Sequence, residues 1–165
     1  MNSAPETIAP QATALVTPES MLKHWQGHRS ITRKAIEVFP EEHLFTFQPA
    51  PPMRSFGALM IEVLGLIEPT VKGVEVSDFS YGELGKITSK AALLEAWDAN
   101  TITLDAGIKG ISPTRWLEVV TVYGSKQSMF GFVDYLLENE IHHRAQGYVY
   151  LRLLGLEPPF FHPME

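Results

Sequence analysis

Apolar residues recur at helical spacing in four long stretches of this chain. In the first stretch, Ser20 is a plausible N-cap and Pro40 supplies a stop, so the pattern predicts a helix over about residues 20–39. The apolar positions that carry this pattern are Leu22, Trp25, Ile31, Ala35 and Val38.

A second helix is predicted where Ser55 precedes the strongly apolar segment FGALMIEVLGLIE. Proline lacks the backbone donor that a helix interior requires, so we expect this helix to end or kink near Pro69. Residues 69–87 hold three glycines and show no lasting period, which predicts a long loop.

The third helix is predicted from Ser89 to about Ile108, with apolar positions at Ala92, Leu93, Trp97, Ile102 and Leu104. The next segment, WLEVVTVYG, is rich in β-branched residues and could form a strand. No second clear strand is present to pair with it, so we interpret it as an extended connector.

The fourth and longest helix is predicted over about residues 126–154, because Gly155 followed by Leu-Glu-Pro-Pro is a helix-stop signal. Four helices with long connectors and no internal repeat predict an all-α fold, a four-helix bundle with long connecting loops.

Length and composition favour one domain. With 165 residues, of which 45% are hydrophobic, the chain can bury one core, and its size argues against a second. The first residues are rich in Ala, Pro and Thr and lack a signal-peptide pattern. We therefore predict a flexible arm over residues 1–18 and a single bundle domain over residues 19–165.

Charge and residue types exclude several functions. Thirteen basic and nineteen acidic residues give a net charge of −6 without a stripe of Lys and Arg, so we expect no nucleic-acid partner. The apolar run FGALMIEVLGLI is too short to cross a bilayer, so we expect no membrane association and a cytoplasmic protein. The chain has no cysteine, so a metal site would need His, carboxylate, amide or water ligands.

The segment ENEIHHRAQ brings candidate chemistry into the fourth helix. His143 and Asn139 share a face with the apolar positions Phe132, Leu136, Tyr150 and Leu154, whereas His142 points about 100° away. In the second helix, Glu62 lies within an apolar run, where a carboxylate is costly unless it is paired or metal-bound. A buried Glu62–His143 pair without metal and a metal site both remain open.

Other polar residues have simpler interpretations. His24 and His28 have the i, i+4 spacing of metal ligands, but no acidic third ligand is near in sequence, which favours a surface or hydrogen-bonded pair. Arg144 and Gln146 would line the mouth of a site or cap backbone groups.

The run HHRAQGYVYLRLLGLEPP resembles the end of the DinB family of four-helix-bundle metalloenzymes, and RSFGALMIEVLG resembles that family's second helix. The first helix, HWQGHRSITRKAIEVFPEEHL, extends the resemblance to essentially the whole domain. The family's three metal-binding histidines would fall at Glu62, Asn139 and His143, so the resemblance implies a site of which one histidine remains.

The resemblance further implies a divalent metal, Zn, Ni, Mn or Fe, bound weakly or not at all, because Asn is a weak neutral ligand. It implies a metal-dependent transferase or hydrolase with unknown catalytic residues and an unknown small-molecule substrate. A non-catalytic small-molecule-binding bundle or a purely structural bundle that has lost the metal site remains the alternative. As the family often does, the chain is expected to form a homodimer, which would cover apolar residues on a second face of the fourth helix.

Overall fold

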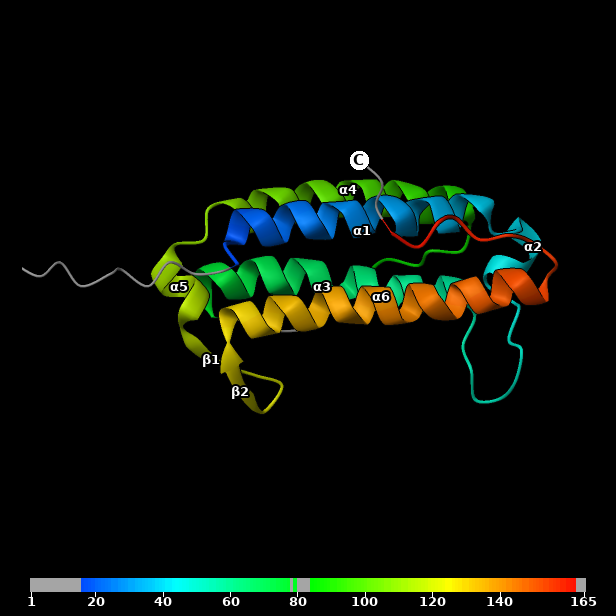
Figure 1. Cartoon of the computed structure of the whole chain (residues 1–165). Helices are drawn as coiled ribbons and strands as arrows, with labels where there is room; N and C mark the ends of the chain where they lie inside the picture. The colour runs from blue at the N-terminus through cyan, green and yellow to red at the C-terminus, as the bar shows by residue number, and fades with distance from the viewer. Residues whose placement is uncertain (1–15, 78, 80–83, 163–165) are drawn as a thin grey trace, which may run out of the picture.

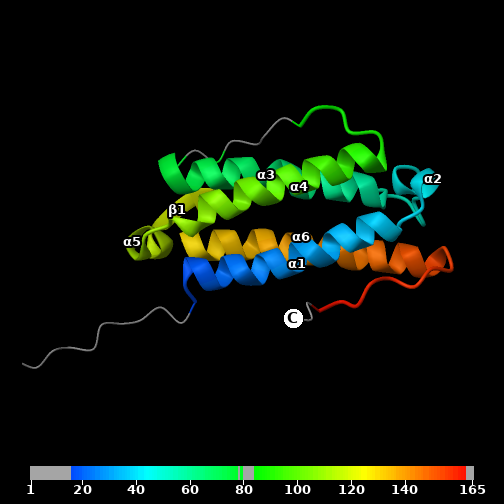
Figure 2. The same ribbon diagram turned by 90° about the horizontal axis from the view of Figure 1, so that it is seen from above.

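The structure, a computed structural model, describes residues 16–77, 79 and 84–162. Four long helices lie side by side (Figures 1 and 2): α1 (Pro18–Val38), α3 (Phe56–Val76), α4 (Lys90–Lys109) and α6 (Met129–Leu153). Both α1 and α3 pack against α4 and against α6, so the helices enclose a common interior. The mostly helical fold expected from the sequence is confirmed.

Serine and threonine side chains begin the long helices as capping chemistry requires. Ser55 and Ser89 are the N-caps of α3 and α4, as predicted, and Ser128 caps α6. The first cap was misplaced by three residues: Thr17 is the N-cap, and Ser20 completes its capping box. The predicted stop at Gly155 is confirmed, since this residue adopts a φ of 77° just beyond α6.

The start of the chain departs from the predicted division at residue 18. Residues 1–15 of the predicted arm lie outside the described residues, but Val16 to Pro18 belong to the folded unit. Pro18 opens α1, and the Val16 carbonyl accepts a hydrogen bond from the indole of Trp116 at 3.0 Å.

The prediction of a loop over residues 69–87 is wrong for residues 69–76, because α3 continues through Pro69 to Val76. Pro69 and Thr70 are buried, so packing holds them in helical conformation despite the proline. Arg115 then donates to the carbonyls of Gly73 at 2.7 Å and Val74 at 2.8 Å. A residue some forty positions away therefore satisfies the last turn of α3, which local sequence patterns do not reveal.

The expectation of an extended connector is also wrong. Its first residues end the short helix α5 (Pro113–Leu117), and β1 (Val119–Val122) pairs antiparallel with β2 (Ser125–Ser128). The partner strand was missed because its sequence, SKQS, is polar. Tyr123 and Gly124 both have positive φ, which suits the tight turn between the strands. The fourth long helix consequently starts at Met129 rather than at residue 126, and a further short helix, α2 (Glu41–Leu44), occupies a predicted connector.

The core is built around three tryptophan side chains from α1, α4 and α5. Trp25, Trp97 and Trp116 are buried, and each indole nitrogen donates a hydrogen bond. Among the described helices, none combines the length and apolar character that crossing a membrane requires.

Close packing between α3 and α6 requires a glycine. A Cβ atom at Gly147 would lie 2.3 Å from the ring of Phe56, which itself stacks on Phe39 with 5.0 Å between ring centroids. The two helices can approach at this point only because residue 147 has no side chain.

We predict that Gly147→Ala lowers the free energy of unfolding by about 1–3 kcal/mol, because the displaced Phe56 ring has little room to move. Gly110→Ala is the matched control: no atom lies within 4 Å of its added Cβ, so stability should change by less than about 1 kcal/mol. Urea denaturation of both variants measures the difference, and equal stabilities would contradict the close approach.

Candidate functional site

Three predicted site residues meet between α3 and α6. Glu62 lies in the middle of α3, and Asn139 and His143 lie one turn apart on α6. The Nε2 atom of His143 is 3.1 Å from Oε1 of Glu62 and 3.3 Å from Nδ2 of Asn139. His143 is buried, whereas about a quarter of the Glu62 side chain, 26%, remains accessible. The structure therefore brings these three side chains together.

Arg54 is a fourth member of the site that sequence reasoning missed. Its guanidinium forms an ion pair with Oε2 of Glu62, the carboxylate oxygen that His143 does not contact. The Arg54 carbonyl accepts a hydrogen bond from the Tyr150 hydroxyl at 3.1 Å, which ties the segment before α3 to α6. Arg54 precedes the helix in sequence, so helical periodicity gave no sign that it folds back onto Glu62.

Protonation at this site follows from burial and pairing. Burial alone would raise the pKa of Glu62, but hydrogen bonds from Arg54 and His143 outweigh it and hold the pKa below its ordinary value. Burial lowers the pKa of His143, and the neighbouring Glu62 opposes this only in part. At neutral pH the site therefore contains a carboxylate and a neutral imidazole, whose Nε2–H donates to Glu62.

Two buried polar atoms at the site have no hydrogen-bond partner among the described residues: Oδ1 of Asn139 and Nδ1 of His143. Rotating the Asn139 amide by half a turn would exchange its oxygen and nitrogen and turn the oxygen toward His143. The amide can thus present either a donor or an acceptor to the point where Glu62 and His143 meet.

The spacing of the three side chains is compatible with a single metal ion. Oxygen and nitrogen ligands lie about 2.0–2.2 Å from such an ion, so neighbouring donor atoms are roughly 2.9–3.5 Å apart. The separation of Glu62 Oε1 and His143 Nε2, 3.1 Å, falls in this range. The Asn139 amide lies 3.3 Å from His143 Nε2 through its nitrogen, so it would present its oxygen to an ion only after the half-turn rotation. Across the described ranges, no group of three His, Cys, Asp or Glu side chains is placed to hold a metal, so a site here depends on the Asn139 amide.

A separate ion network lies on the neighbouring face of α6, toward α1. Glu140 is fully buried, and its carboxylate accepts hydrogen bonds from Trp25 Nε1 at 2.9 Å and Thr32 Oγ1 at 2.6 Å. Arg29 Nη1 approaches the same carboxylate at 3.6 Å. Glu140 was not predicted as a functional residue, although its position one turn before Arg144 is a signal that the sequence contains.

Arg29 extends this network to α4. It donates to the Trp97 carbonyl at 3.1 Å and to Thr101 Oγ1 at 2.7 Å, and its guanidinium carbon lies 4.0 Å from the centroid of the Trp97 ring. Burial lowers the pKa of Arg29, while Glu140 opposes the shift. One buried carboxylate therefore connects three of the four long helices.

Arg144 completes the network on the α1 side. It donates to the His28 carbonyl at 3.1 Å, to Thr32 Oγ1 at 3.0 Å and to His28 Nδ1 at 2.9 Å. Of the two roles considered for Arg144, the bonding of backbone groups is the one observed. His28 is hydrogen-bonded and buried, whereas His142 is exposed and contacts Gln146 Nε2 at 2.8 Å.

Comparison with known protein families matches residues 11–164 to the DinB family. The uncharacterized protein YjoA of Bacillus subtilis (strain 168) is 23% identical over 145 residues, which are 86% of this chain and 94% of that protein. The crystal structure of YjoA, a DinB-like protein, has a TM-score of 0.73 at 20% identity and covers 87% of this chain and 99% of its own. A DinB-like protein from Bacillus cereus ATCC 10987 gives 0.70 at 21% identity, with 86% and 95% covered. These two structures share the fold.

We predict that Glu140→Ala costs about 3–5 kcal/mol of unfolding free energy, because Arg29 would stay buried without its counter-charge. Glu138→Ala, two residues away on the exposed side of α6, should change stability by less than about 0.5 kcal/mol. Chemical denaturation at neutral pH compares the two. A cost for Glu140→Ala below about 1 kcal/mol would show that the bundle does not depend on this carboxylate.

Acid should destabilise the protein partly through His28. The pKa of His28 is lowered to about 4 in the folded protein, mainly because the side chain is buried. The nearby charges of Arg144, His24 and His162 lower this pKa further. The unfolded chain binds a proton near pH 6.5, so this contribution is fully present above that pH and is lost as pH falls toward 4. The loss should be on the order of 2–3 kcal/mol.

The test is the pH dependence of the unfolding free energy for wild type and for His28→Gln. His28→Gln should flatten the decline between pH 6.5 and 4, whereas the control His142→Gln, at an exposed position, should leave it unchanged. An unchanged decline in His28→Gln would contradict the assignment to His28.

Proposed function

This chain belongs to the DinB family, and we propose that it carries a modified divalent-metal centre formed by Glu62, Asn139 and His143. The activity proposed for this centre is metal-dependent hydrolysis or group transfer on a small-molecule substrate. The observation that supports the proposal is the convergence of the three side chains at 3.1 and 3.3 Å around His143 Nε2.

The chemistry of the donor set supports this assignment. Glu62 is ionised and His143 is neutral, which are the forms that bind a divalent ion, and the Asn139 amide adds a neutral oxygen. Zn, Ni, Mn or Fe accept such nitrogen and oxygen ligands. A bound ion of this kind supplies Lewis acidity and lowers the pKa of a water molecule or thiol at the site. Arg54 lies beside the carboxylate, where its charge would hold an anionic group of a substrate.

Two features of the chain predict weak binding. The Arg54 guanidinium already neutralises Glu62 and would repel an incoming cation. In addition, His143 Nε2 must give up its proton to become a ligand, and the proton would move to the buried Nδ1, which has no acceptor among the described residues. Metal binding therefore requires the Arg54–Glu62 ion pair to separate. It also leaves the Nδ1–H group of His143 without an acceptor among the described residues.

The same two features favour the alternative function. Arg54 and His143 together satisfy the Glu62 carboxylate without a metal, as a non-catalytic small-molecule-binding bundle or a structural bundle would require. The metal proposal and this alternative differ in whether a divalent ion displaces Arg54.

Assembly into a homodimer also remains part of the proposal. Val149 and Leu153 are 53% and 61% exposed on α6, so the bundle core does not cover them. Tyr148 and Leu151, which lie next to these positions on α6, are buried within the bundle. The surface available for a second copy is therefore smaller than the sequence indicated.

The test is isothermal titration of tag-free protein with Mn²⁺, Ni²⁺ and Zn²⁺. We predict weak binding by wild type and about fivefold tighter binding by Arg54→Gln, because a partly exposed ion pair of roughly 1 kcal/mol no longer competes. Arg152→Gln, an exposed arginine on α6, is the control and should bind as wild type does. Glu62→Gln should abolish binding.

A double variant separates a weakened site from a misplaced one. Glu62→His with Asn139→His restores three imidazole ligands at the converging positions and should bind Zn²⁺ or Ni²⁺ markedly more tightly than wild type. If wild type binds no metal but this variant does, the alternative function holds. If neither binds, the three positions do not form a metal centre.

A further inference from the structure

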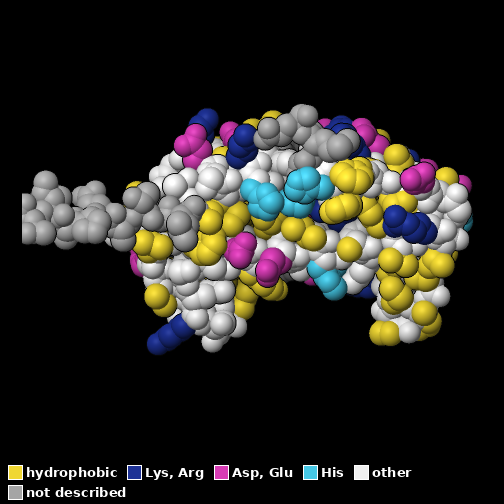
Figure 3. Space-filling model, in the orientation of Figure 1, with side chains coloured by type: hydrophobic (Ala, Val, Ile, Leu, Met, Phe, Trp, Pro, Cys, Tyr) yellow, Lys and Arg dark blue, Asp and Glu magenta, His cyan; other side chains and the backbone are white. Residues whose placement is uncertain are grey.

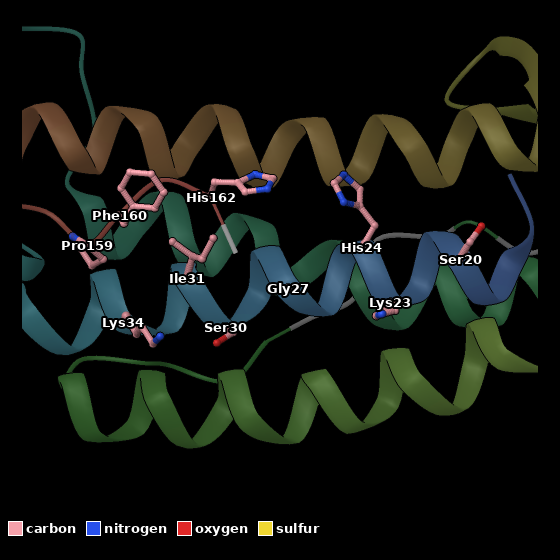
Figure 4. A pocket seen from close by; sticks show the side chains of 10 residues that line it. All are labelled: Ser20, Lys23, His24, Gly27, Ser30, Ile31, Lys34, Pro159, Phe160 and His162. Atoms are coloured by element: carbon pink, nitrogen blue, oxygen red, sulfur yellow. The ribbon is translucent and has the colours of Figure 1, made fainter. Parts of the chain in front are cut away.

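A cavity of about 660 Å³ lies between α1 and the segment that follows α6. Figure 4 shows residues of α1 along one side of it and Pro159, Phe160 and His162 on the other. The imidazole rings of His24 and His162 point toward one another over α1 near Gly27 (Figure 4). The Glu62 site lies elsewhere, between α3 and α6.

The lining of this cavity is positively charged, in contrast to the chain as a whole. Lys23 and Lys34 line it together with His24 and His162, and no carboxylate is among the described residues that line it. The whole chain has a net charge of −6, so a cavity whose described lining contains basic side chains and no carboxylate differs from the average surface.

Buried groups beside α1 add to the positive potential. His28 is in edge-to-face contact with His24, with 4.7 Å between ring centroids, and its Nδ1 accepts a hydrogen bond from Arg144. Arg144 and Arg29 are both buried and share one buried carboxylate, Glu140, while the partly exposed Asp98 also acts on Arg29. A divalent cation would find no acidic ligand among the described residues that line the cavity, so the His24–His28 spacing does not by itself indicate a metal site here.

The cavity also offers apolar surface. Ile31 forms part of its wall, and the ring of Phe160 is 57% exposed beside it. Figure 3 shows histidine side chains at the centre of this face of the molecule with hydrophobic side chains on either side. An apolar group can stack on such a ring while a charged group contacts Lys34.

We propose that this cavity binds a small organic anion, with a carboxylate or phosphate group held by Lys34, His24 and His162 and an apolar body packed on Ile31 and Phe160. Its volume lies in the range of small-molecule sites, roughly 300–1,000 Å³. This binding function goes beyond the proposed metal centre and does not require it, because the two sites share no residue.

The experiment is isothermal titration of the full chain, without an affinity tag, with phenyl phosphate, benzoate and neutral benzyl alcohol. We expect phenyl phosphate or benzoate to bind with a Kd near or below the millimolar level, and benzyl alcohol to bind at least tenfold more weakly. The stronger of the two anions identifies the headgroup as phosphate or carboxylate.

Matched charge reversals locate the binding. Lys34→Glu should weaken the anion at least tenfold, whereas Lys126→Glu, which makes the same charge change on the exposed strand β2, should change affinity less than twofold. Phe160→Ala tests the apolar wall at an exposed position and should weaken phenyl phosphate without affecting inorganic phosphate. Circular dichroism of each variant confirms that the fold is retained.

Three results would overturn the proposal. These are the absence of measurable binding by either anion, equal weakening by Lys34→Glu and Lys126→Glu, and unchanged phenyl phosphate affinity in both Lys34→Glu and Phe160→Ala.

Discussion

A single buried carboxylate, that of Glu140, determines how the long helices of this bundle are arranged. It accepts hydrogen bonds from Trp25 and Thr32 of α1, and through Arg29 it is connected to the Trp97 carbonyl and Thr101 of α4. A fully buried charge is tolerated only when its partners surround it, so these contacts leave few rotations of α6 that satisfy it. The apolar core stabilises the bundle, whereas this network selects one orientation of the helices.

The rotation of α6 in turn positions the candidate metal centre. Neighbouring residues on a helix point about 100° apart, so once Glu140 and Arg144 face α1, Asn139 and His143 face α3. Gly147 lets α3 come close enough for Glu62 to contact His143, since a larger residue would collide with Phe56. The geometry of the site is therefore a consequence of a network that takes no part in its chemistry.

The sequence predicted those features that local patterns encode. The caps at Ser55 and Ser89, the stop at Gly155 and the inward direction of His143 all follow from helical periodicity and capping chemistry. The features it missed depend on distant residues. Arg115 extends α3 beyond Pro69, a polar strand pairs with β1, and Arg54 folds back onto Glu62. None of these contacts leaves a periodic signal, because each is made by one side chain or by backbone groups alone.

Charge compensation distinguishes the two faces of α6. On the α3 face, one carboxylate is balanced by one arginine at a partly exposed position, so a cation that competes with Arg54 can gain access to Glu62. On the α1 face, two buried arginines share one buried carboxylate, and they lie beside a cavity lined by lysines and histidines. Desolvation strengthens such fields, because water screens them less than it screens surface charges. Adjacent residues of one helix thus face a carboxylate paired with a partly exposed arginine on one side and buried arginines beside a basic cavity on the other.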